Sequence, residues 1–182
     1  MAGWLVTAGL MVWQALASVP PPPLPGWVAL PALPTVPTGP IAGKVDRIVI
    51  DKTGRLMVAF RDGRPLRGFQ IGLGFAPAGD KHRQGDGRTP EGVFRVDRRN
   101  DASRFHLSLG LDYPRAQDRA RARAAGVDPG GDIFIHGQPN GRVARGYRIK
   151  GDWTDGCIAV SDAEIEDLFA ATSIGTLVEI RP

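Results

Sequence analysis

The only cysteine of the chain, Cys157, follows a glycine and is the first candidate for chemistry. His136 lies 21 positions upstream, after the apolar run 133–135, and is followed by Gly137. A thiolate is a strong nucleophile and an imidazole can take its proton near neutral pH, so this pair is sufficient for cysteine acyl transfer. Gly156 leaves room for backbone N–H groups to point at a developing oxyanion. The Gly137 carbonyl can accept a hydrogen bond from one ring nitrogen and fix its tautomer.

A purely structural interpretation of the pair also fits the spacing. Free cysteines are usually buried, so Cys157 could be a small core residue and His136 a satisfied residue at a strand end. His82 lies in a charged loop, where we expect it to be solvated, and His106 opens a short strand, where we expect a structural role. No Cys/His cluster has zinc spacing and no phosphate-binding loop occurs, so we expect neither a metal nor a cofactor.

The composition indicates a soluble domain that needs no disulfide. Of the 182 residues, 42% are hydrophobic and 23% are charged, as is ordinary for a globular protein. The net charge of +4 favours an acidic partner such as an anionic polymer, although arginine-rich composition explains it equally well. No basic block is interleaved with aromatic residues, so we do not expect nucleic acid as a partner.

Residues 1–17 have the features of a signal peptide. Gly3–Leu16 is apolar and Ala15–Ala17 offers a small-residue cleavage site. The run is shorter than the roughly 20 residues of a membrane span, but no Lys or Arg precedes it, so an uncleaved N-terminal membrane anchor is the alternative. Either way we expect an exported protein, in an oxidising compartment where a single cysteine has no internal disulfide partner.

Residues 18–43 are expected to form an extended linker, because nine prolines lie between Val19 and Pro40. Residues 44–182 are expected to form one mainly β domain. Its short β-rich runs are Lys44–Asp51, Arg55–Arg61, Leu66–Ile71, Val93–Asp97, His106–Leu109, Asp132–Ile135, Cys157–Val160 and Thr176–Ile180. The alternation in Arg55–Arg61 predicts a half-buried strand.

Two helices are predicted in the same region. Ala116–Ala125 alternates Arg and Ala without a strong apolar stripe, so we expect it to pack lightly. Ser161 and Glu164 fit a capping box, and the helix that follows has an apolar face.

Three segments then carry a resemblance to a known family. Lys81 precedes Gly85–Phe94, with the sequence GDGRTPEGVF; 135–137 is IHG; and 154–158 is TDGCI. In this order they resemble the motifs of the L,D-transpeptidase catalytic domain family, the YkuD-type domain, over roughly 44–182. The run TDGCIAV is similar to the YafK-like branch, some of whose members resemble amidases that release wall-bound lipoprotein.

The resemblance implies a β-sandwich or barrel-like domain with two or three short helices. It implies Cys157 as nucleophile, His136 as general base and acid, and the Gly137 carbonyl as the group that orients the imidazole. The donor is then the tetrapeptide stem of peptidoglycan, attacked at the L-centre of its third residue with release of D-Ala. The acyl group passes to another stem, a lipoprotein lysine or a D-amino acid; transfer to water would make the enzyme a hydrolase. The location implied is the periplasm or cell wall.

Some details depart from the family. Asp155 stands where many members carry a histidine, and it would repel a thiolate unless it points away or binds a cationic group. We expect Thr154, Asp155 and Gly156 to form the oxyanion and substrate-binding part of the site. The loop 138–153 is basic, and its Arg148 is predicted to bind stem carboxylates; a solvated loop is the alternative.

Other classes fit less well. A sortase-like transpeptidase, with His106 as its histidine, lacks the TLxTC pattern in this chain. Papain-like and NlpC-like peptidases place the cysteine before the histidine, and no histidine follows Cys157. A wall-binding module without activity would have no need to retain a thiol.

Overall fold

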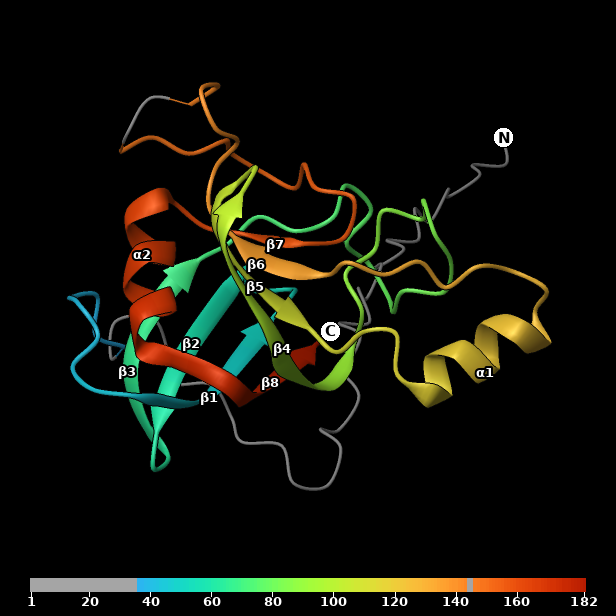
Figure 1. Cartoon of the computed structure of the whole chain (residues 1–182), viewed down its shortest axis with the longest axis horizontal. Coiled ribbons are helices and arrows are strands. Elements are labelled where there is room, and N and C mark those ends of the chain that lie inside the picture. The colour runs from blue at the N-terminus through green and yellow to red at the C-terminus, as the bar shows by residue number, and fades with distance from the viewer. Residues whose placement is uncertain (1–35, 144–145) are drawn as a thin grey trace, which may run out of the picture.

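The structure is a computed structural model that describes residues 36–143 and 146–182. The predicted signal peptide at 1–17 and most of the predicted linker at 18–43 therefore lie outside the described residues. Eight strands form one sheet in the order β3-β2-β1-β8-β4-β5-β6-β7 (Figure 1). The elements are β1 Val45–Asp51, β2 Leu56–Arg61, β3 Arg64–Gln70, β4 Gly92–Ser103, β5 His106–Leu111, α1 Ala116–Ala124, β6 Phe134–His136, β7 Ile158–Ala159, α2 Asp162–Ala171 and β8 Thr172–Arg181. The mainly β prediction is confirmed, with two helices in the described part of the chain.

Strands β1, β2 and β3 form the expected antiparallel meander, but β2 is not half-buried as predicted. Met57 and Ala59 belong to the main core, while Leu56, Val58 and Phe60 join a second buried cluster with Val36 and Val49. The second cluster is covered by the chain before β1, since the Gly68 N–H donates to the Pro37 carbonyl at 2.9 Å. The prediction was wrong because both faces of β2 are covered: Met57 and Ala59, on the face that the alternation assigned to solvent, pack into the main core, and Val36 covers the other face.

The rest of the sheet brings distant segments together. β8 pairs in parallel with β1 and antiparallel with the first part of β4, and the remainder of β4 pairs with β5. β5 pairs with β6, and β6 pairs in parallel with β7. His136 is thus the last residue of β6, and Cys157 directly precedes the neighbouring strand β7 at one end of the sheet.

Helix α2 begins at the predicted capping box. Ser161 N–H donates to Glu164 Oε2 at 2.8 Å, and the Ser161 hydroxyl accepts from the Glu164 N–H at 3.4 Å. Its apolar face is buried in the main core through Ile165, Leu168 and Ala171. The helix packs mainly on β5 and also contacts β6 and β8.

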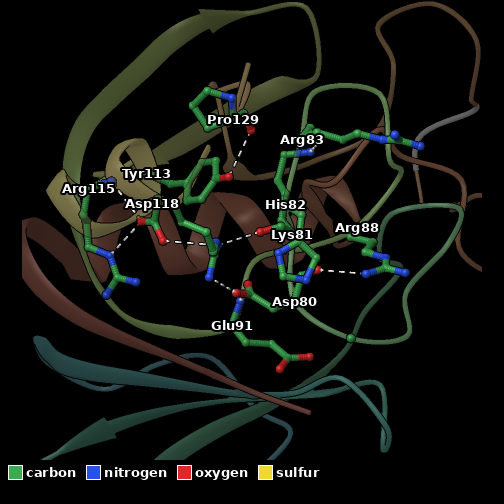
Figure 2. Close-up of polar contacts among 12 residues, drawn as sticks. Asp80, Lys81, His82, Arg83, Arg88, Glu91, Tyr113, Arg115, Asp118 and Pro129 are labelled. Atoms are coloured by element: carbon green, nitrogen blue, oxygen red, sulfur yellow. Dashed lines mark hydrogen bonds and ion pairs between the residues drawn. The ribbon is translucent and has the colours of Figure 1, made fainter. Parts of the chain in front are cut away.

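Helix α1 is attached by charged groups, because it lacks an apolar stripe. Arg121 donates to Asp80 Oδ2 and to the Lys81 carbonyl, both at 2.8 Å, and the buried Asp118 accepts from Arg115 (Figure 2). The helix thereby holds the loop 79–91, which contains most of the Gly85–Phe94 segment. Among the described residues, no helix is both long and apolar enough to cross a membrane.

Candidate active site

Cys157 lies at the end of a tight turn, immediately before β7. The strand β7 pairs with β6 so that Ile158 faces Ile135 and Ala159 faces His136. The half-buried thiol donates a weak hydrogen bond from Sγ to the Asp132 carbonyl at 3.4 Å. Cys157 and His136 line the same cavity of about 780 Å³. The sheet topology thus places the thiol and the imidazole in one site.

The imidazole of His136 is held in one tautomer. Its Nδ1 lies 2.7 Å from the Gly137 carbonyl oxygen, which can only accept, so Nδ1 carries the proton. Nε2 is then the ring nitrogen with a free lone pair. The ring packs against Phe105, with centroids 4.6 Å apart, and edge-on to Trp153 at 5.8 Å. Burial lowers the pKa of His136, and the bond to the Gly137 carbonyl offsets this in part, so the neutral imidazole is favoured near pH 7.

The thiol is also neutral at rest. Burial raises the pKa of Cys157 to about 11; the negative charges of Asp155 and Asp132 add to the rise, and the Phe134 backbone N–H and Lys81 oppose it. The raised pKa of the thiol and the lowered pKa of the imidazole both favour the neutral forms, so the resting site holds no thiolate–imidazolium ion pair. In such a pair the imidazole can take the thiol proton as a base at the moment of attack.

The turn 154–157 is cross-linked by the buried hydroxyl of Thr154. This hydroxyl donates to the Cys157 carbonyl at 2.7 Å and accepts from the Gly156 N–H at 3.2 Å. The Gly156 N–H is therefore engaged within the turn. The Cys157 N–H donates to no residue in the part of the chain that the structure describes. It is the donor that remains for an oxyanion.

The Gly85–Phe94 segment packs against the turn 154–157, where the Arg88 carbonyl lies close to Gly156. The Asp86 carboxylate accepts from Lys81 Nζ at 2.8 Å and from three backbone N–H groups, at His82, Arg83 and Arg88, at 2.8 to 3.1 Å. Burial alone would raise the pKa of Asp86, but these four donors lower it to about 2. The ionised carboxylate thus fixes the loop whose Arg88 carbonyl packs against the turn 154–157.

A second buried lysine, Lys52, fastens the same loop to the sheet. Its Nζ donates to the Gly79 carbonyl at 2.6 Å, the Thr89 carbonyl at 3.0 Å and Glu91 Oε1 at 2.8 Å. No local pattern could have shown its role, because its partners lie 27 to 39 residues away.

The described residues were also compared with the requirements of a metal site. Across residues 36–143 and 146–182, no group of three or more His, Cys, Asp or Glu side chains could hold a metal ion.

Comparison with known proteins identifies the domain. The profile of the YkuD family, described as the L,D-transpeptidase catalytic domain, matches residues 45–180. The chain belongs to this family. A search of curated proteins finds no match.

Solved structures with the same fold include other L,D-transpeptidase domains. The helical cell shape determining protein Pgp2 from Campylobacter jejuni is 25% identical, with a TM-score of 0.58 over 78% of this chain and 49% of that one. Bd1075 from Bdellovibrio bacteriovorus is 20% identical, with a TM-score of 0.53 over 78% and 52%. An L,D-transpeptidase from Xylanimonas cellulosilytica is 19% identical, with a TM-score of 0.51 over 77% and 62%. The chain spans about half the length of the first two structures.

Some residues of the transpeptidase domain enter the cavity without a signal in the sequence. Ser108 on β5 faces His136 across the β5–β6 ladder and lines the cavity. Phe105 and Arg104 reach it from the turn between β4 and β5. Only the pairing of β5 with β6 places them there, and that pairing is not local in sequence.

Two of the predicted substrate-binding residues of the transpeptidase domain lie in different places. Asp155 is exposed and lines the cavity with Cys157. Arg148 lies elsewhere: it donates to the carbonyl and side-chain oxygens of Gln70, at 2.7 and 2.6 Å, and lines a separate hollow of about 370 Å³. The structure therefore does not bring Arg148 to the thiol.

The other two histidines lie outside the cavity. His82 is exposed, and His106 Nε2 lies 2.8 Å from Glu166 Oε1 on α2. Neither lines the cavity of Cys157.

Proposed function

We propose that this protein is a cysteine L,D-transpeptidase that acts on the tetrapeptide stems of peptidoglycan. The observation that carries the proposal is the tautomer of His136. Because Nδ1–H is bound to the Gly137 carbonyl at 2.7 Å, Nε2 is the free base, in the cavity that also holds Cys157. Membership of the L,D-transpeptidase family supplies the substrate class.

The proposed acylation begins with the neutral pair. The Cys157 sulfur attacks the carbonyl carbon of the third stem residue while its proton passes to His136 Nε2. The Cys157 N–H stabilises the oxyanion of the tetrahedral intermediate. His136 then gives the proton to the amine of the departing D-Ala, and a thioester remains on Cys157.

Deacylation reverses these roles. An acceptor amine attacks the thioester, His136 takes its proton, and the Cys157 thiolate leaves and recovers that proton. Three kinds of amine fit this step: another stem, a lipoprotein lysine or a D-amino acid. Water in place of the amine yields a shortened stem. We propose an exported enzyme working at the cell wall, with 1–17 as its signal peptide or membrane anchor and no cofactor.

The test is product analysis with the purified protein. Tetrapeptide-bearing wall fragments are incubated with the protein or with Cys157→Ala, and the products are separated by mass. Cross-linked or D-amino-acid-exchanged stems from the native protein alone support transfer, and shortened stems or released lysine peptides support hydrolysis. The absence of every one of these products contradicts the proposal.

A further inference from the structure

The peptide unit between Gly137 and Gln138 holds the imidazole of His136. Its oxygen, the Gly137 carbonyl, accepts from His136 Nδ1 at 2.7 Å. Its nitrogen, the Gln138 N–H, donates to Asp162 Oδ1 at 2.8 Å. Because the peptide bond is planar and has partial double-bond character, these two groups move as one rigid body. The Asp162 carboxylate is thus joined to the imidazole through two hydrogen bonds and one peptide unit.

Asp162 fixes this peptide unit from outside. The preceding unit is held by backbone groups at both ends: the His136 carbonyl accepts from the Val160 N–H at 2.9 Å, and the Gly137 N–H donates to the Phe105 carbonyl at 3.1 Å. The next unit has no such backbone partner in the part of the chain that the structure describes. Its carbonyl is bound to the imidazole alone, and its N–H is bound to Asp162 alone.

Two local features let the carboxylate come this close. Asp162 is the first residue of α2, directly after the N-cap Ser161, and a negative charge is favourable at this end of a helix. Gly137 has no side chain, and a methyl group added there would lie 2.7 Å from Asp162 Oδ1. The glycine that follows the histidine therefore leaves room for the carboxylate.

The orientation of the peptide unit decides which ring nitrogen is the base. With the carbonyl turned to Nδ1, this nitrogen carries the proton and Nε2 keeps its lone pair. A unit turned over would present the Gln138 N–H to the ring, so Nδ1 would have to accept and the proton would reside on Nε2. The bond to Asp162 opposes this reversal, because the reversal would leave a half-buried carboxylate without its donor.

The charge of Asp162 acts in the same direction. A hydrogen bond to a carboxylate is stronger than one between neutral groups, and hydrogen bonds in a chain polarise one another. The Gly137 carbonyl therefore accepts more strongly from Nδ1–H, which makes Nε2 more basic. This effect opposes the burial that lowers the pKa of His136.

Other ionisable groups surround the ring without contacting it through hydrogen bonds. They are Lys81, Arg104, Asp132, Asp155 and Cys157 in the cavity, His106 beside Gly137 with its partner Glu166, and, on α2, Glu164, which is bonded to Ser161. Among the described residues, none of them is hydrogen-bonded to the imidazole or to the peptide unit. Asp162 is therefore the ionised group that acts on the ring through a continuous chain of bonds.

We propose that Asp162 is a positioning residue, which acts through the peptide unit 137–138 to hold His136 as the Nδ1–H tautomer with Nε2 free. Asp162 touches neither the thiol nor the substrate, and it sets the state of the base from behind. The effect on turnover rests on the proposed function, whereas the tautomer can be measured without any substrate.

The test is nitrogen NMR of the full chain with isotope-labelled histidine, because the shifts of the two ring nitrogens report which one is protonated. The signals of His136 are assigned by their absence from His136→Gln. At neutral pH we expect a protonated Nδ1 and a bare Nε2 in the native protein. In Asp162→Ala the Nε2–H tautomer should appear, and kcat/KM for a stem tetrapeptide should fall roughly tenfold, as the loss of one hydrogen bond suggests.

Asp162→Asn separates geometry from charge. Its amide oxygen still accepts from the Gln138 N–H, so the native tautomer and most of the turnover should be retained. The acid limb of kcat/KM should move to lower pH, because a negative charge that favours the imidazolium has been removed. A merely structural role of Asp162 would lower the unfolding free energy without moving the tautomer or the acid limb.

Asp167→Ala is the matched control. Asp167 also lies on α2 and also accepts from a backbone N–H, that of Ile41 at 2.9 Å, but it does not line the cavity. This variant should lower Tm and leave the His136 signals and kcat/KM native.

Native nitrogen signals in folded Asp162→Ala would overturn the proposal. If that variant does not fold, Asp162→Asn decides, and an acid limb at the native position overturns it. Absence of turnover by the native protein contradicts the proposed function instead. In that case the pH titration of the His136 signals in Asp162→Asn takes the place of the acid limb, with a lower midpoint supporting the proposal and an unchanged one overturning it.

Discussion

The backbone of Gly156 packs directly on the carbonyl of Arg88: a methyl group added at Gly156 would lie 2.7 Å from that oxygen. Gly156 also has a φ of +136°, which L side chains rarely adopt. The segment Gly85–Phe94 and the turn 154–157 are distant in sequence but share this contact. It explains physically why the GDGRTPEG and TDGC motifs occur together in one site.

Gly156→Ala should therefore damage both stability and turnover. Positive φ alone costs about 1 kcal/mol, and the close contact must push the turn away from Arg88, so we expect about 2–3 kcal/mol of lost stability. Urea unfolding and kcat/KM measure the two effects. Gly63→Ala is the control, since Gly63 has a φ of +74° but open space around it. Equal losses of stability in the two variants, with kcat/KM retained in both, would show that the contact between Gly156 and the Arg88 carbonyl is unimportant.

The pH dependence of kcat/KM should be that of an enzyme whose active form has a neutral His136 imidazole and a neutral Cys157 thiol. Because burial lowers the pKa of His136 below its ordinary 6.5, the acid limb should lie below pH 6.5. Because the pKa of Cys157 is raised to about 11, no thiol ionisation should alter the rate between pH 7 and 9. Alkylation of the thiol by iodoacetamide should accordingly accelerate steadily up to about pH 11. Alkylation already at its maximum at pH 7 would indicate a preformed thiolate instead.

Asp86 should govern the acid stability of the site. Its folded pKa of about 2 lies below its ordinary 3.8, so it stabilises the fold fully above about pH 4 and loses this effect as the pH falls through 2. The shift corresponds to at most about 2 kcal/mol. Asp86→Asn should lower the unfolding free energy at pH 7 and flatten its decline between pH 4 and 2. Asp101→Asn, at an exposed position, should match the native curve; an unaltered curve for Asp86→Asn would refute the assignment.

His106 should be dispensable for turnover. Its Nε2 is occupied by Glu166 at 2.8 Å, and it does not line the cavity. His106→Asn suits the backbone φ of +67° and removes only the half-exposed contact with Glu166, which is worth about 0–1 kcal/mol. Native kcat/KM with a slightly lower Tm is the expected result. Loss of turnover at native stability would restore the sortase-like alternative for this histidine.

Much of the fold could be predicted where the signal is local. The capping box at Ser161 and the apolar face that includes Ile165 both appear in α2 as expected. The β4 strand was predicted only over Val93–Asp97, but it extends to Ser103. Its second half is exposed and charged, so it pairs with β5 without the apolar alternation that reveals a strand.

The site was predictable to a similar extent. Cys157 and His136 could be selected as candidates from residue type and motif order, and both line one cavity. Lys52 and Phe105 could not, since their roles depend on contacts with residues far along the chain. Arg148 lines a different hollow from the one that holds Cys157, and a basic loop does not show which hollow its side chains face.

The central claim is that Cys157 forms a thioester with the first three residues of the stem. The most direct measurement is the intact mass of the protein, acid-quenched during turnover of a tetrapeptide, followed by peptide mapping. If Cys157 is acylated as proposed, its mass increases by that of the tetrapeptide less D-Ala, and Cys157→Ala shows no such increase. Product formation with an adduct on another residue, or undiminished turnover by Cys157→Ala, would contradict it.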